Sequence, residues 1–232
     1  MTAGGDLGYD RYSTRNCDEW LMRIGAPEAR PLLFVPPLFE EMNRTRALLA
    51  ATMRALAPRG YCCWLPDLPG TGESERALDE IGWEDWRDAV RDAAAAVALE
   101  AGRSPAVASL RGGALLDDAV ETDCRWRFAP ADGASLSRDL LRSSLVAQQD
   151  GAPGLDLAGY RLGETLLDTL ATAIPAPLEP LRVVRLASDR GDADFKLDGP
   201  ALWRRSEPAS SPELAAALAD DLAAWIAQCD AS

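Results

Sequence analysis

The amino-acid sequence predicts an α/β fold, in which a mostly parallel central sheet lies between two layers of helices. Short apolar runs alternate with segments whose apolar residues recur at helical spacing, a pattern typical of parallel sheets covered on both faces. The chain of 232 residues is long enough for one domain with a full core, and no internal repeat or long linker divides it. We therefore expect residues 1–232 to form a single domain.

The first half of the chain supplies most of the expected elements. Pro36-Pro37 closes the first apolar run, and Pro58-Arg59-Gly60 ends the helical segment that follows it. Strands are expected at residues 32–35, 61–65, 105–110 and 124–129, and helices at residues 43–56, 83–97 and 112–120.

The second half begins with an irregular stretch. Residues 132–176 are weakly periodic and contain Gly and Pro, which indicates an excursion from the sheet that we expect to be a small inserted cap. Further strands are expected at residues 181–187 and 201–203. The closing helix is the clearest, because Ser211 can cap it, Pro212 suits its first turn and an apolar stripe follows.

Composition excludes several classes of function. The formal net charge is −13, which repels nucleic acids and anionic lipid surfaces. Residues 1–15 lack the apolar core of a signal peptide, and no apolar run could span a bilayer. The five cysteines show no CxxC spacing, and the chain has no histidine. We expect a cytoplasmic protein without disulfides, metal, cofactor, nucleic-acid partner or membrane insertion.

Ligands of open α/β sheets bind at the carboxyl ends of the strands. Three such ends are expected to form a pocket, at residues 36–43, 67–74 and 109–113. The third follows the pattern of a nucleophile elbow, G-x-S-x-G, in which small residues flank a nucleophile on a sharp strand-to-helix turn. Ser109 takes the first glycine position and Gly113 the last, so the residue at the tip is Arg111.

These motifs resemble the α/β-hydrolase superfamily and, within it, the exosortase A system-associated hydrolases of the group called hydrolase 2. Glu40-Glu41-Met42-Asn43 is the most diagnostic segment. The resemblance implies an α/β-hydrolase-like three-layer sandwich, an arginine at the elbow and a role beside bacterial exopolysaccharide and exosortase loci. The matching segments cover most of the chain: residues 34–44, 66–74 and 110–116, and more weakly 158–162 and 199–203.

A Ser-His-Asp hydrolase is not expected, because no histidine can take the nucleophile's proton near neutral pH. The resemblance implies that the histidine would fall within residues 203–206, which read Trp-Arg-Arg-Ser. Asp189 could be a vestigial acid, but turn chemistry favours a turn residue at this position. The sequence therefore favours a binding or accessory protein on a hydrolase fold. The alternative function is an atypical esterase or thioesterase in which Glu40 or Glu41 activates water.

Two hypotheses for Arg111 stay open. Its guanidinium can hold a carboxylate or phosphate in a bidentate fork at a helix N-terminus, which predicts an anionic small molecule as ligand. It can instead form a buried lock with Glu40 or Glu41. In either case Leu38, Phe39 and Gly112 are expected to complete the site, and the partner is an anionic small molecule or a protein of the exopolysaccharide system.

Overall fold

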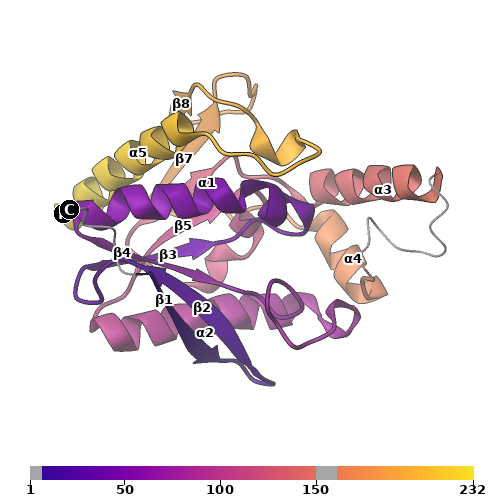
Figure 1. Cartoon of the computed structure of the whole chain (residues 1–232), viewed down its shortest axis with the longest axis horizontal. Helices are drawn as coiled ribbons and strands as arrows, with labels where there is room; N and C mark the ends of the chain where they lie inside the picture. Colours follow the sequence, from indigo (N-terminus) through magenta and orange to yellow (C-terminus); the bar gives the residue numbers. More distant parts are fainter. Residues whose placement is uncertain (1–6, 150–160) are drawn as a thin grey trace.

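The computed structural model describes residues 7–149 and 161–232, and within them it forms an eight-stranded sheet in the order β1-β2-β4-β3-β5-β6-β7-β8 (Figure 1). The pairs β1–β2 and β2–β4 are antiparallel, and the others are parallel. The expected fold class is confirmed. The strands are β1(Leu7–Ser13), β2(Asp18–Ile24), β3(Arg30–Val35), β4(Tyr61–Pro66), β5(Ala106–Leu110), β6(Arg125–Phe128), β7(Leu181–Leu186) and β8(Phe195–Leu197).

Helices cover both faces of this sheet (Figure 1). The helices α1(Glu40–Leu56) and α5(Pro212–Asp230) share one core cluster, and α2(Trp83–Ala101) belongs to another on the opposite face. Successive residues of β3 alternate between the two clusters, with Phe34 in the first and Val35 in the second. The alternation follows from the twofold side-chain period of a strand. Ser211 caps α5 as expected, since its Oγ accepts a hydrogen bond from Leu214 N at 3.4 Å.

The excursion at residues 132–176 contains two helices, α3(Gly133–Gln149) and α4(Glu164–Thr172). α3 projects beyond the carboxyl ends of the strands (Figure 1). Residues 150–160 lie outside the described residues, and they include part of the weaker motif match at 158–162. The expectation that this excursion is a cap stays a prediction.

Three strands were missed, and one expected strand is wrong. β1 was missed because it is an edge strand in which only Tyr12 is buried. β2 lies between β1 and β4, and it was missed because its buried residues, Glu19, Leu21 and Ile24, do not form an apolar run. The strand expected at residues 201–203 is a 3-10 turn, Leu202–Arg204, and the last strand is β8. A run of three apolar residues carries no periodicity, so it cannot distinguish a buried turn from a strand.

The helix expected at residues 112–120 is also wrong. The segment forms two short 3-10 turns, Arg111–Leu115 and Asp117–Ala119. The paired glycines disfavour a helix here, and the side chain of Asp117 forms hydrogen bonds with neighbouring strands. In place of the expected helix, the segment after the elbow forms turns whose Asp117 belongs to a buried polar network.

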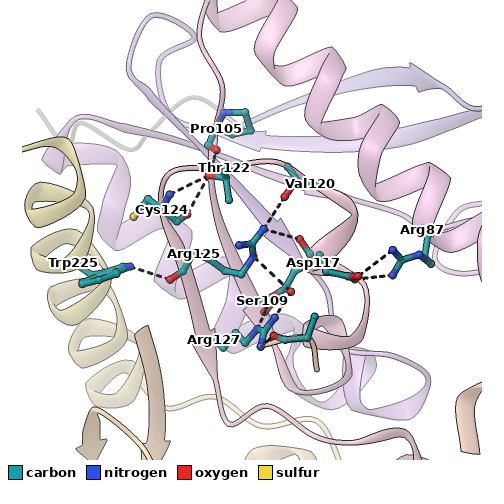
Figure 2. A network of polar contacts seen from close by, with 12 residues as sticks. Arg87, Pro105, Ser109, Asp117, Val120, Thr122, Cys124, Arg125, Arg127 and Trp225 are labelled. Atoms are coloured by element: carbon teal, nitrogen blue, oxygen red, sulfur yellow. Dashed lines mark hydrogen bonds and ion pairs between the residues drawn. The ribbon is translucent and has the colours of Figure 1, made fainter. Parts of the chain in front are cut away.

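Asp117 is the centre of this network (Figure 2). Its carboxylate accepts hydrogen bonds from Ser109 Oγ at 2.7 Å and from Arg127 Nε and Nη2 at 2.8 and 2.7 Å. The Nε of Arg125 lies 3.7 Å from the same carboxylate. Arg127 Nη1 also donates to Ala176 O at 2.8 Å. The network thus ties the elbow to β6 and to the end of the excursion.

Gly113 allows the elbow to pack against the end of β3. A Cβ added there would lie 2.5 Å from Val35 O and 2.6 Å from Pro36 O, closer than real Cβ atoms approach. We expect Gly113→Ala to lower stability by about 1–3 kcal/mol, because backbone atoms must move to admit the methyl group. Thermal unfolding measures the effect. Gly163→Ala is the control, since its Cβ meets no atom closer than 3.4 Å; an equal loss of stability in both variants would contradict the packing argument.

Candidate functional site

Three described residues other than glycine adopt positive φ angles, and each follows a strand: Phe39 at 57°, Arg111 at 50° and Ala129 at 46°. They come after β3, β5 and β6, which are neighbours in the sheet. Such conformations cost about 1–3 kcal/mol each and cluster at functional sites. The carboxyl ends of these three strands are therefore the candidate position of a functional site. The positive φ of Arg111 also gives the elbow its sharp turn.

A pocket of about 900 Å³ opens at this edge of the sheet. Five of the expected site residues line it: Leu38, Phe39, Glu40, Glu41 and Arg111.

Two expectations about the pocket need correction. Gly112 is buried behind the wall, where an added Cβ would lie 2.6 Å from Leu136 Cδ1. The loop at residues 67–74 does not line this pocket either. Its Asp67 and Glu73 line a separate pocket of about 330 Å³ beside β1 and β2. The loop follows β4, whereas the larger pocket is built over β3, β5 and β6.

Arg111 is held at the pocket by three hydrogen bonds. Its Nε and Nη2 donate to Glu41 Oε1 at 3.1 and 2.8 Å, and its Nη1 donates to Ala129 O at 3.0 Å. The two charged side chains are only 11% and 9% exposed. The expected contact with Glu40 or Glu41 is therefore found with Glu41. Both glutamates lie in the first turn of α1, not on the loop where we expected them.

Trp203 lies against the guanidinium of Arg111, whose Cζ is 4.7 Å from the centroid of the indole ring. Trp203 belongs to the segment where the resemblance implies a histidine. Its backbone oxygen accepts a hydrogen bond from Arg44 Nη1 at 3.1 Å. Sequence reasoning did not assign a role to Arg44 or Trp203. The spacing of Arg44 three residues after Glu41 could have placed both on one face of the helix.

Asp189 orients an arginine and a turn. Its Oδ2 accepts a hydrogen bond from Arg185 Nη1 at 2.9 Å, and its Oδ1 accepts one from Gly191 N at 2.9 Å. Burial raises the pKa of this carboxyl, but the hydrogen bonds and the charge of Arg185 outweigh it and hold the pKa below its usual value. Arg185 in turn lines the pocket.

The pocket is rich in charge of both signs. Burial raises the pKa of the Glu41 carboxyl above its usual value, and Arg111 offsets only part of that shift. Six arginines and four acidic residues line the pocket: Arg44, Arg111, Arg138, Arg142, Arg185 and Arg204, with Glu40, Glu41, Asp132 and Asp139.

Two hydroxyl–carboxylate pairs outside the pocket do not supply it with a nucleophile. Ser109 is fully buried, and its partner Asp117 is already held by Arg127. Ser74 Oγ donates to Glu19 Oε1 at 2.8 Å, but it accepts backbone N–H groups at 2.9 and 3.2 Å. Those bonds occupy the lone pairs that an attacking oxygen needs.

Ser135 is the described serine that does line the pocket. Its neighbouring carboxylate is Asp132, whose Oδ1 accepts a hydrogen bond from Ser135 N at 2.7 Å. Hydrogen bonds from Ser135 lower the pKa of Asp132, which makes that carboxylate a weaker base. This pair is therefore poorly suited to activate a nucleophile.

Two features are absent from residues 7–149 and 161–232. No group of three or more His, Cys, Asp or Glu side chains is arranged to hold a metal ion. No helix in this part of the chain is both long and apolar enough to cross a membrane.

No model of a known protein family matches the chain, and no curated protein matches its amino-acid sequence. A solved structure of a proposed aryl esterase from Burkholderia cenocepacia is 13% identical with a TM-score of 0.63, and the match covers 97% of this chain and 100% of that one. The thioesterase domain from the curacin biosynthetic pathway is 15% identical with a TM-score of 0.59, over 94% and 99% of the two chains.

A third match is partial. An epoxide hydrolase from Vigna radiata is 13% identical with a TM-score of 0.42, and the match covers 53% of this chain and 38% of that one. The chain therefore spans less than half the length of that protein, and the likeness carries no argument. At these identities the first two structures establish the fold alone. The chain has an α/β-hydrolase fold.

Proposed function

We propose that this protein is a ligand-binding accessory protein on an α/β-hydrolase fold, and that it does not use a Ser-His-Asp mechanism. The contact between Arg111 and Trp203 carries the proposal. Arg111 stands where the elbow would present a nucleophile, and Trp203 stands where the resemblance implies the base. Neither can accept a proton near neutral pH, because a guanidinium stays charged and an indole N–H only donates.

The ligand we propose is an anionic small molecule. Six of the chain's 24 basic residues line one pocket, although the chain as a whole carries a net charge of −13. Arginine binds carboxylates and phosphates through its planar fork, and a concentration of positive charge in a cleft attracts anions. The volume of about 900 Å³ suits a small molecule.

The biological setting we propose follows from the resemblance to exosortase-associated hydrolases. In that setting the protein acts in the cytoplasm, beside the machinery of exopolysaccharide production, and a protein of that system is a further partner. The excursion at residues 132–176 would act as the cap of the pocket, because Leu136 and Leu140 of α3 contribute to its wall.

We expect the protein to bind a multiply charged anion such as inorganic diphosphate, and to bind it through Arg111. Isothermal titration calorimetry of the whole chain measures this, with Arg111→Gln as the test variant. Arg205→Gln is the control, because Arg205 is an exposed arginine outside the pocket wall. We expect at least about tenfold weaker binding for Arg111→Gln and no change for Arg205→Gln, since a charged hydrogen-bonded pair contributes about 1.5–3 kcal/mol.

An atypical esterase or thioesterase is the second candidate, and the raised pKa of Glu41 favours it. A carboxyl with a raised pKa can serve as a general base on water. Turnover of p-nitrophenyl acetate that Glu41→Gln abolishes would support this candidate. Labelling of a serine by a fluorophosphonate would instead reveal a nucleophile and contradict the accessory role.

A further inference from the structure

Four side chains form a connected group at the elbow end of the pocket, which we call the floor cluster: Glu41, Arg44, Arg111 and Trp203. Arg111 bonds Glu41 and lies on the ring of Trp203, and Arg44 bonds the backbone oxygen of Trp203. All four line the pocket. The cluster contains two cations and one carboxylate, so its formal charge is +1 when Glu41 is ionised.

The floor cluster leaves hydrogen-bonding capacity unused. Glu41 Oε2, Arg44 Nε and Trp203 Nε1 are buried without a hydrogen-bond partner among the described residues. Arg111 has five N–H donors and uses three of them on Glu41 and Ala129. One acceptor atom and several donors therefore lie unmatched on four residues that are linked by these contacts.

The arrangement of the Arg111–Glu41 pair explains why Glu41 Oε2 is left over. A carboxylate that meets the arginine fork with both oxygens satisfies two donors with two acceptors. Here both donors, Nε and Nη2, bond the same oxygen, Oε1. A buried polar atom without a partner costs about 1–3 kcal/mol, and native proteins retain few of them. Such an atom in the wall of a pocket indicates a site that a ligand completes.

The unmatched atoms define what that ligand must offer. The donors of Arg111, Arg44 and Trp203 require an oxyanion. Glu41 Oε2 requires a hydrogen-bond donor, such as a hydroxyl, because a second carboxylate oxygen would repel it. A simple carboxylate leaves the acceptor unmatched, and a neutral polyol leaves the net positive charge of the floor uncompensated.

We propose that the ligand of this pocket is a hydroxy acid of sugar size, whose carboxylate binds Arg111 while a hydroxyl donates a hydrogen bond to Glu41. This inference rests on the proposed function, namely that the pocket binds an anion, and it adds the chemical class. The pocket of about 900 Å³ has room for a six-membered ring with its substituents. Because Glu41 Oε2, Arg44 Nε and Trp203 Nε1 are buried, binding requires their side chains to move toward the ligand.

Three probes of similar size separate the two requirements. D-glucuronate carries both a carboxylate and hydroxyls, cyclohexanecarboxylate carries only the carboxylate, and D-glucose carries only hydroxyls. Calorimetric titration of the whole chain is expected to show D-glucuronate binding at least about tenfold more tightly than cyclohexanecarboxylate, from one hydrogen bond to a charged acceptor. We expect no measurable binding of D-glucose.

Glu41→Gln tests the acceptor directly. The variant should lose most of the preference for D-glucuronate over cyclohexanecarboxylate, because the charged acceptor is gone. Glu100→Gln is the matched control, since Glu100 is an exposed glutamate of α2 outside the pocket wall, and it should keep the preference. Circular dichroism confirms that each variant is folded before it is titrated.

The outcomes distinguish this inference from the function on which it rests. Equal binding of D-glucuronate and cyclohexanecarboxylate would overturn the hydroxy acid and leave an anion-binding pocket in place. An unchanged preference in folded Glu41→Gln would overturn the role of Glu41. If neither acid bound and diphosphate did not bind either, the proposed function itself would be wrong.

Discussion

Asp117→Asn is expected to destabilise the folded chain by about 3–5 kcal/mol, the cost of breaking a buried ion pair by removing one partner. Asp117 is fully buried, and Arg125 and Arg127 beside it are each only 3% exposed. Without the carboxylate, two cations would lie in the core with no anion against them (Figure 2). The melting temperature should fall by about 10 °C, as expected for a chain of this length.

Asp118→Asn is the matched control. Asp118 is the next residue and also forms a bidentate pair, with Arg87 at 2.6 and 3.0 Å. Its side chain is 25% exposed and that of Arg87 is 22% exposed. Solvent screens such a pair, so its loss should cost no more than about 1 kcal/mol. If the two variants lost equal stability, burial would not be the cause, and the network would not be what supports the elbow.

The fold was largely predictable because the central strands β3, β4 and β5 are buried on both faces. The apolar runs that became β3, β4 and β5 were found nearly at their true bounds. β1 and β8 escaped notice because most of their residues are exposed, which leaves no apolar run in the sequence. The turns at residues 111–119 were mistaken for a helix because the sequence does not reveal that Asp117 bonds two neighbouring strands.

The candidate site was predictable only where the elbow motif pointed to it. The position of Arg111 and its contact with Glu41 followed from the motif and from the need to pair a buried guanidinium. The position of Trp203 on Arg111 could not be derived, because the two residues are far apart in the chain and Trp203 lies on a turn that no periodicity marks. The arginines of α3 were missed for a similar reason, since nothing in the sequence places that helix over the pocket.

Arg111→Ala separates the two hypotheses for the elbow residue. As a lock, Arg111 neutralises Glu41, whose side chain is only 9% exposed. Its loss would leave a buried carboxylate without a cation, and we expect a cost of about 3–5 kcal/mol in thermal unfolding. Arg111→Lys should recover only part of this, because an ammonium lacks the planar fork. Glu41→Gln in the Arg111→Ala background should also restore stability, since it removes the unpaired charge.

The pH dependence of Arg111→Ala gives the lock a sharper test. Burial raises the pKa of Glu41, and the charge and hydrogen bonds of Arg111 oppose that rise. Without the arginine this opposition is lost, so the pKa of Glu41 should rise further. A carboxyl whose pKa is higher in the folded than in the unfolded state destabilises the fold when pH is high, and the penalty disappears once pH falls below the unfolded pKa. The stability deficit of Arg111→Ala should therefore be larger at pH 8 than at pH 4.5. An unchanged melting temperature together with lost anion binding would reject the lock and favour the anion site. No effect on either would contradict both hypotheses for Arg111.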